Sequence, residues 1–114
     1  MIEKFAIGID VVEINRFSLK NFPENIEFYK KIFTKNEIDY CTKFKEPYTH
    51  FAGKFALKEA VIKALKTKIN LLEIETFHKN NVPHVNLKNY SDYSSICSIS
   101  HENSVAVAVF LIEF

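Results

Sequence analysis

Residues 51–64 decide the fold of this chain, and they read Phe-Ala-Gly-Lys-Phe-Ala-Leu-Lys-Glu-Ala-Val-Ile-Lys-Ala. The stretch contains no proline and is built largely from strong helix formers, so it predicts a helix over residues 50–66. At about 100° per residue, the apolar side chains of this helix lie almost all round its axis and leave no broad polar face. We therefore expect a largely buried helix that the rest of the chain surrounds.

The flanking segments supply the candidate strands. Residues 5–14 form an apolar run rich in β-branched side chains, which predicts a mostly buried strand. Residues 95–100 alternate small polar and apolar side chains, and residues 105–114 are almost continuously apolar, so together they predict a C-terminal hairpin. Residues 72–77 and 85–87 are two shorter candidates, joined by a turn-like segment.

Shorter helices are expected between the first strand and the long helix. Residues 24–33 indicate one of them, and Thr34 with Glu37 has the spacing of a capping box that begins the next. A chain of 114 residues falls within the usual size of one domain. The pattern predicts an α+β fold, with an antiparallel sheet packed around a long buried helix in a single domain of residues 1–114.

Composition and charge exclude several classes of function. Hydrophobic residues make up 47% of the chain and charged residues 25%, an ordinary globular balance. A net charge of +1 argues against strong nonspecific binding to nucleic acid. No apolar run approaches the roughly 20 residues that cross a bilayer, and the N-terminus lacks the pattern of a signal peptide. We expect a cytoplasmic protein with no membrane or nucleic-acid partner.

The two cysteines do not indicate a metal or disulfide framework. Cys41 and Cys97 lie far apart in the sequence, with no CxxC or Cys/His spacing around either of them. We expect reduced, buried thiols at both positions.

Asp10 and the charges of the long helix are the candidate residues for chemistry. An aspartate in an apolar strand is costly unless it is paired, hydrogen-bonded or bound to a cation. Glu59 and Lys63 lie four residues apart and are therefore adjacent on the helix surface, as are Lys54 and Lys58. Glu59 with Lys63 can be an ordinary ion pair, or Asp10 and Glu59 can be the two carboxylates of a magnesium and phosphate site. Spacing alone leaves both interpretations open.

His101 and Arg16 are weaker candidates. His101 falls where a strand is expected to end, and it can be a turn residue or a functional one. Arg16, the only arginine of the chain, follows the first strand. Its guanidinium suits bidentate recognition of carboxylates or phosphates, although a single surface arginine often contributes nothing measurable.

Four segments, taken together, resemble the bacterial holo-acyl-carrier-protein synthase family. Residues 7–16 are similar to the motif G-[IL]-D-x-x-x-x-x-R, and residues 51–64 are similar to F-A-x-[KR]-F-A-x-K-E-A-x-x-K-A. Residues 98–101 resemble S-[IL]-[ST]-H, and residues 33–37 resemble [FL]-[TS]-x-x-E. The motifs occur in the family's order and span nearly the whole chain.

The resemblance implies an enzyme. Members of the family transfer 4′-phosphopantetheine from coenzyme A to a serine of apo acyl carrier protein, which gives holo acyl carrier protein and adenosine 3′,5′-bisphosphate in fatty acid biosynthesis. By the same resemblance, Asp10 and Glu59 hold Mg²⁺, and Lys63 lies beside the coenzyme A diphosphate, so that these three residues form the catalytic set. The base for the serine proton is Glu59 itself or a metal-bound water, and the sequence does not decide between them.

The resemblance also implies further contacts and partners. Lys54 and Lys58 correspond to basic residues that face the coenzyme A phosphates and nucleotide, and His101 corresponds to a histidine at the nucleotide end. Arg16 and Lys20 correspond to a basic first helix that docks the carrier protein. A homotrimer with active sites shared between subunits is expected.

The chain departs from the family pattern after the long helix. Residues 66–69 read Lys-Thr-Lys-Ile where many relatives have G-T-G-[IL], and residues 80–83 read Asn-Asn-Val-Pro where relatives have an N-G-K-P-like turn. Contacts to coenzyme A near these two segments are therefore open. The alternatives are transfer to a peptidyl or polyketide carrier, a non-catalytic trimer that keeps a nucleotide pocket, and a nucleic-acid-binding module.

Overall fold

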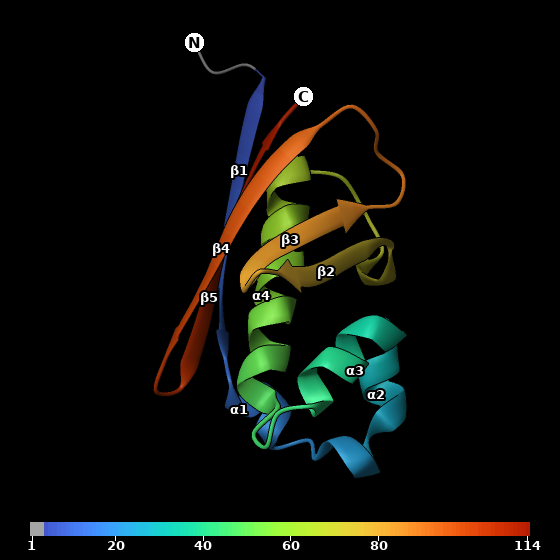
Figure 1. Cartoon of the computed structure of the whole chain (residues 1–114), viewed down its shortest axis with the longest axis vertical. Coiled ribbons are helices and arrows are strands. Elements are labelled where there is room, and N and C mark those ends of the chain that lie inside the picture. The colour runs from blue at the N-terminus through green and yellow to red at the C-terminus, as the bar shows by residue number, and fades with distance from the viewer. Residues whose placement is uncertain (1–3) are drawn as a thin grey trace.

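The computed structural model describes residues 4–114, which form an α+β fold around one long helix (Figure 1). The elements in chain order are β1 (Phe5–Glu13), α1 (Asn15–Ser18), the 3₁₀ turn η1 (Phe22–Glu24), α2 (Ile26–Lys30), α3 (Lys35–Thr42), α4 (Tyr48–Leu65), the 3₁₀ turn η2 (Leu71–Glu73), β2 (Ile74–Lys79), β3 (Val82–Leu87), β4 (Ser94–Glu102) and β5 (Val105–Glu113).

The elements form layers on two sides of α4. On one side lies a three-stranded antiparallel sheet of order β1-β5-β4, so that β1 and β4 are its two edges. On the other side lie the separate β2–β3 hairpin and the short helices α2 and α3, as Figure 1 shows. The helix α4 is thus enclosed between two layers, as the sequence predicted.

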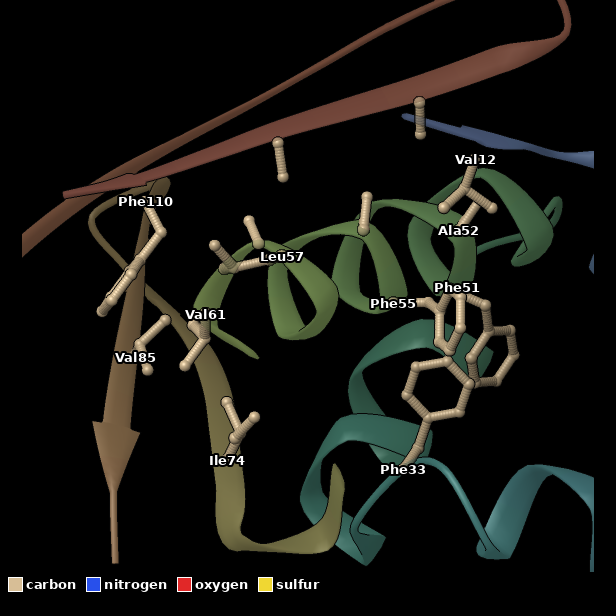
Figure 2. Close-up of a cluster of buried hydrophobic side chains, with 14 of the residues drawn as sticks. Val12, Phe33, Phe51, Ala52, Phe55, Leu57, Val61, Ile74, Val85 and Phe110 are labelled. Carbon is tan, nitrogen blue, oxygen red and sulfur yellow. The ribbon is translucent and has the colours of Figure 1, made fainter. Parts of the chain in front are cut away.

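The helix α4 is buried around most of its circumference, which confirms the interpretation of its apolar sequence. Figure 2 shows its side chains pointing both toward the sheet and toward Phe33 and the β2–β3 hairpin. The rings of Phe33 and Phe51 lie 4.9 Å apart and join the short helices to α4. The buried residues of α4 are Phe51, Ala52, Gly53, Lys54, Phe55, Ala56, Leu57, Lys58, Ala60, Val61 and Ala64. Two of these are lysines, whose ammonium groups must be satisfied inside the protein.

The strand β1 and the helix α4 touch backbone to backbone at Gly8. A Cβ atom at this position would lie 1.8 Å from the carbonyl oxygen of Ala60 and 2.9 Å from the backbone nitrogen of Ala64. Only a residue without a side chain fits there. The contact sets the distance between the strand and the helix, and Asp10 follows two residues along the same face of β1.

The prediction that β1 is mostly buried was wrong. Phe5, Ile7, Ile9 and Val11 are between 44% and 64% exposed, because they point away from α4. The alternate residues, Gly8 and Val12 among them, face the helix and are buried. Since both faces of this strand are apolar, composition alone could not separate the buried face from the exposed one.

Several predicted boundaries differ from the structure. The helix α4 begins at Tyr48, two residues before the predicted start. The strand β2 begins and ends two residues later than predicted, and β3 begins three residues earlier, because their turn consists only of Asn80 and Asn81, whose positive φ angles of 54° and 64° suit a two-residue hairpin. The strand β4 runs to Glu102, so His101 lies within the strand and not in the turn.

The capping box at the start of α3 is confirmed. The Thr34 side chain accepts a hydrogen bond from the backbone of Glu37, and the Glu37 carboxylate accepts one from the backbone of Thr34. Within residues 4–114, no helix is both long and apolar enough to span a membrane.

Candidate functional site

Asp10 and Lys63 meet at the edge of the sheet where β1 contacts α4. The Lys63 ammonium donates to Asp10 Oδ1 at 2.9 Å and to the carbonyl oxygen of Ile9 at 3.0 Å. The Asp10 side chain is 17% exposed and that of Lys63 is 58% exposed, so the pair lies at the surface with its carboxylate turned inward. Asp10 is thus a paired charge in an apolar strand, one of the conditions under which such a charge is tolerated.

Glu59 lies one turn before Lys63 on the same side of α4. The residue is half-buried and directly precedes Ala60, which is the residue that touches Gly8. Lys63 reaches across to β1, and among the described residues no ion pair joins it to Glu59. The simple helical ion pair that the spacing allowed is therefore not formed. Instead, the helix turn that carries Glu59 and Lys63 is pressed against the strand that carries Asp10.

This arrangement has the donor set of a hard-cation and phosphate site. Magnesium characteristically takes one or two carboxylates, with water and substrate phosphates in the other positions. Asp10 and Glu59 are the residues that could hold such an ion, and Lys63 could face a phosphate beside it. In residues 4–114, no group of three or more His, Cys, Asp or Glu side chains is gathered for metal binding. The two-carboxylate set is the one that fits.

Lys54 lies on the opposite side of α4, under the β2–β3 hairpin. Its side chain is 1% exposed, and its ammonium donates to the carbonyl oxygen and the hydroxyl of Thr76 at 3.1 and 3.2 Å. The ammonium also lies 4.7 Å from the centre of the Tyr40 ring. Burial lowers the pKa of Lys54, against the opposing influence of Cys41 and Glu37.

A cavity of about 240 Å³ opens beside Lys54, between α4, the hairpin and β4. His101 of β4 lines this cavity together with Lys54, so the structure brings these two predicted residues to one place. Two further histidines, His50 and His78, and the ring of Tyr40 also line it. The cavity therefore gathers basic and aromatic side chains.

Lys58 is in the protein core. Its ammonium forms an ion pair with Glu37 at 2.6 Å, and both side chains are fully buried. It also donates to the carbonyl oxygens of Ile32 at 2.8 Å and Leu71 at 3.0 Å, so its three N–H bonds all have partners within the chain. The other Glu37 oxygen accepts from the backbone and hydroxyl of Thr76 at 2.7 and 2.6 Å. The ammonium of Lys58 thus has no N–H bond left for the contact with coenzyme A that the resemblance implied, and that role stays a prediction.

The predicted residues form two groups that face opposite ways. Lys54 and Lys63 are nine residues apart, which turns their side chains by about 180° around the helix axis. Asp10 lies on β1 and His101 on β4, the two opposite edges of the sheet. We call Asp10, Glu59 and Lys63 the carboxylate half-site, and Lys54 with His101 the cavity half-site. The helix α4 separates the two half-sites within one chain.

Arg16 and Lys20 lie at the surface around the short helix α1. The Arg16 guanidinium lies 5.0 Å from the centre of the Phe55 ring, and the Lys20 ammonium lies 4.8 Å from the centre of the Phe28 ring. Leu19, between them, is 81% exposed. The aromatic rings hold both cations in place beside an exposed apolar side chain, which is a surface suited to an acidic partner with an apolar contact.

Sequence reasoning did not assign a role to His50 and His78. The two residues come from different elements, α4 and β2, and no spacing in the sequence connects them. The cysteines are free thiols, Cys41 buried and Cys97 half-buried. Burial raises the pKa of Cys41 to about 12 and that of Cys97 to about 11, so neither is a reactive thiolate.

The sequence and the fold match a known family of enzymes. The family model of the 4′-phosphopantetheinyl transferase superfamily matches residues 6–110. The chain therefore belongs to the 4′-phosphopantetheinyl transferase superfamily.

Within this superfamily, the chain is similar to curated proteins named holo-[acyl-carrier-protein] synthase. The one from Caldicellulosiruptor saccharolyticus is 41% identical over 123 residues, which cover 96% of each chain. The one from Chlamydia trachomatis serovar D is 37% identical over 118 residues, which cover 96% of this chain and 99% of the relative. These matches confirm the resemblance seen in the motifs.

Solved structures of such synthases share the fold. A holo-(acyl-carrier-protein) synthase from Bacillus anthracis, in complex with CoA (3′,5′-ADP), superposes with a TM-score of 0.81 at 30% identity over 95% of each chain. The Helicobacter pylori synthase in complex with coenzyme A gives a TM-score of 0.80 at 33% identity, over 94% of this chain and 99% of the other. The predicted α+β class is confirmed.

Proposed function

We propose that this chain is a holo-[acyl-carrier-protein] synthase, which transfers 4′-phosphopantetheine from coenzyme A to a serine of apo acyl carrier protein in fatty acid biosynthesis. The observation that carries the proposal is the contact of β1 with α4, which brings Asp10 and Lys63 within 2.9 Å of each other beside the turn that holds Glu59. The coenzyme A complexes of the B. anthracis and H. pylori synthases support the donor.

Each residue of the carboxylate half-site has a role in this reaction. The serine oxygen forms a bond to the β-phosphorus of coenzyme A, the bond from that phosphorus to the bridging oxygen breaks, and adenosine 3′,5′-bisphosphate departs. Lys63 stabilises negative charge on the diphosphate. Glu59, directly or through a water molecule, accepts the serine proton. Asp10 keeps the Lys63 ammonium at the edge of the sheet, facing the substrate.

Magnesium fits the carboxylate half-site, and we propose Asp10 and Glu59 as its ligands. Glu59 accepts no hydrogen bond from the described residues, and Lys63 occupies only one of the two oxygens of Asp10, so both carboxylates have oxygens open to a cation. Bound there, Mg²⁺ would neutralise charge on the diphosphate oxygens, as it does in phosphoryl transfer generally.

The cavity half-site suits the nucleotide end of coenzyme A. Lys54 and His101 line the cavity and can pair with phosphate, while the Tyr40 ring offers an aromatic surface. Lys58 is left out of this proposal because its three N–H bonds are already used by Glu37, Ile32 and Leu71.

We also propose that the chain assembles as a homotrimer with shared active sites. The two half-sites face opposite sides of α4, so one coenzyme A within a chain would have to pass around the helix to contact both. If the carboxylate half-site of one subunit meets the cavity half-site of the next, the contact is heterologous, and such contacts form a closed ring when the rotation between subunits closes.

An exposed apolar surface is available for this assembly. The outer sheet face turns away from α4, and its apolar residues would otherwise be in contact with water. A second copy of the chain is the partner that the opposed half-sites require. The outer sheet face comprises Phe5, Ile7, Ile9 and Val11 of β1, Ile96 of β4, and the half-buried Val105, Val107, Val109 and Leu111 of β5.

The acyl carrier protein is proposed to dock at α1. Arg16 and Lys20 supply positive charge, and the exposed Leu19 supplies an apolar contact, which together suit an acidic helix. We keep the acyl carrier protein as the proposed partner over a peptidyl or polyketide carrier, because the curated relatives are named holo-[acyl-carrier-protein] synthase. The cytoplasmic location stays a prediction.

Mass spectrometry of an apo carrier protein tests the proposed activity. The carrier is incubated with this protein and coenzyme A, with Mg²⁺ in one arm and with EDTA in the other. We expect a gain of about 340 Da on the carrier serine, the mass of phosphopantetheine, only in the arm with the metal. No gain on any of several fatty-acid, peptidyl and polyketide carriers would reject the transferase activity and favour a non-catalytic nucleotide-binding trimer.

A further inference from the structure

Two histidines without a role in the proposed reaction line the cavity half-site. His78 of β2 stacks on Tyr40 of α3, with ring centres 4.7 Å apart and planes 5° apart. His50 of α4 stacks on the Phe44 ring at 3.7 Å and 16°. Both rings are thus fixed by aromatic partners while lining the same cavity as Lys54.

His78 carries a nitrogen that lacks a partner. Its Nδ1 atom is buried and makes no hydrogen bond with any of the described residues. A buried polar atom without a partner costs free energy, and such atoms in native structures commonly mark a functional position. The cavity beside His78 is large enough for a phosphate group and the sugar attached to it, at about 240 Å³.

The charges around the two histidines are mainly positive. The pKa of His78 is lowered to about 4. Burial is the largest cause, and the nearby Lys54 of α4, His50 of α4 and His84 of β3 lower the pKa further. Burial also lowers the pKa of His50, as do Lys54 and His101, while Glu46 before α4 opposes the shift. His78 is therefore neutral at pH 7, and the described residues that line the cavity include no carboxylate.

We propose that His50 and His78 bind a phosphate group of coenzyme A in this cavity, and that His78 takes up a proton when the phosphate binds. This inference rests on the proposed function and adds two phosphate-binding residues and a proton to it. Burial and the nearby positive charge of Lys54 both favour the neutral ring of His78 while the cavity holds no anion. A bound phosphate places negative charge beside His78, which favours the protonated ring, and a phosphate oxygen can accept a hydrogen bond from that ring.

The sign of the pH dependence follows from this coupling. The bound state holds a proton on His78 at a pH where the free state does not, so affinity for coenzyme A rises as the pH falls. The effect is lost above the pKa of His78 in the complex. Because the phosphate monoester of the ligand itself gains a proton near pH 6, the useful range is about pH 6.5 to 8. We expect the dissociation constant for coenzyme A to be about three- to fivefold lower at pH 6.5 than at pH 8.

Isothermal titration calorimetry with coenzyme A tests the proposal. Titrations at pH 7 in two buffers of different ionisation enthalpy give the number of protons taken up on binding. The wild-type protein is expected to take up about half a proton more than His78→Phe, which keeps a stacked ring on Tyr40 but has no nitrogen. The control is Asn86→Ala, since Asn86 is an exposed, uncharged residue of β3 that does not line the cavity. It is expected to behave as the wild type.

The same titration with dephospho-coenzyme A identifies the phosphate. If the uptake is lost with this ligand, His78 binds the ribose phosphate, and if it persists, His78 binds the diphosphate. His50→Gln provides a second variant in case His78→Phe is unstable, and it is expected to weaken coenzyme A binding by about tenfold, the effect of one charge-assisted hydrogen bond.

Equal proton uptake in the wild type and His78→Phe, with transfer to the carrier intact, would overturn this inference alone. A wild-type protein that binds no coenzyme A at any pH would overturn the proposed function as well.

Discussion

Lys58 and Lys63 stand five residues apart on one helix, and the protein uses them in different ways. Lys58 is fully buried, pairs with Glu37 at 2.6 Å and joins α4 to η2 and to the loop before α3. Lys63 is 58% exposed and pairs with Asp10 at 2.9 Å at the edge of the sheet. Both are lysines with a carboxylate partner.

The difference lies in what a substrate can reach. Lys58 has no free donor and no exposed surface, so its charge can only serve the fold. Lys63 keeps most of its side chain in solvent, so a ligand can reach its ammonium, although its partner Asp10 is turned inward. Burial therefore separates the structural lysine from the lysine that we assign to catalysis.

The largest expected effect is on stability at Lys58. Lys58→Met leaves the Glu37 carboxylate buried without its partner, which typically costs about 3–5 kcal/mol. Lys63→Met, on the same helix, is expected to cost less, about 1–2 kcal/mol, because the Asp10 carboxylate that it leaves without a partner is still partly in contact with water. Urea unfolding measures both. Equal losses of unfolding free energy would mean that the contrast between the two lysines is false.

The next effect is on activity at the carboxylate half-site. Asp10→Ala, Glu59→Ala and Lys63→Met are each expected to lower transfer by about 100-fold or more while the protein stays folded, because each removes a charge that faces the reacting phosphate. The assay is carrier modification followed by mass spectrometry, with circular dichroism to check the fold. Glu13→Gln at the exposed end of β1 is the control. Normal turnover of Asp10→Ala or Glu59→Ala would reject the metal assignment.

Gly8 tests the strand–helix contact that holds this half-site together. Gly8→Ala places a methyl group against the Ala60 carbonyl, so β1 must move, at a cost of about 1–3 kcal/mol or more and with a loss of transfer. Gly53→Ala is the matched control, since its methyl group would meet only the Ile99 side chain at 3.0 Å. Thermal unfolding of the two variants should differ clearly, and an unchanged Gly8→Ala protein would contradict the close contact.

The smallest effect is expected at α1. Arg16→Glu reverses one charge of the proposed docking surface and should weaken carrier binding by about tenfold, with coenzyme A binding nearly unchanged. Binding of both ligands can be measured by calorimetry, and Lys35→Glu on α3 serves as a charge-matched control. An equal loss of affinity for the carrier and for coenzyme A would contradict the assignment of Arg16 to carrier docking.

Much of the fold could be predicted because the relevant signals are local. The composition of residues 50–66 indicated a buried helix, and Thr34 with Glu37 indicated where α3 begins. The exposed face of β1 could not be predicted, because its apolar outer residues resemble a second buried face and only the arrangement of the other elements decides which face α4 covers.

The candidate site was predictable in part. Asp10 stood out because a charge in an apolar strand needs a partner, and the structure supplies Lys63. The burial of Lys58 was not predictable, because its partners Glu37, Ile32 and Leu71 come from distant parts of the sequence. The separation into two half-sites was not predictable for the same reason: it depends on which edge of the sheet each strand occupies.

Mixing two inactive variants tests the central claim most directly. One variant carries Asp10→Ala and lacks the carboxylate half-site, and the other carries Lys54→Met with His101→Ala and lacks the cavity half-site. If neighbouring subunits share each active site, co-assembly of equal amounts should restore about a quarter of the wild-type activity, because about one site in four then combines two intact halves. No restoration in proven mixed assemblies would contradict the account, since it would mean that each active site is built within one chain.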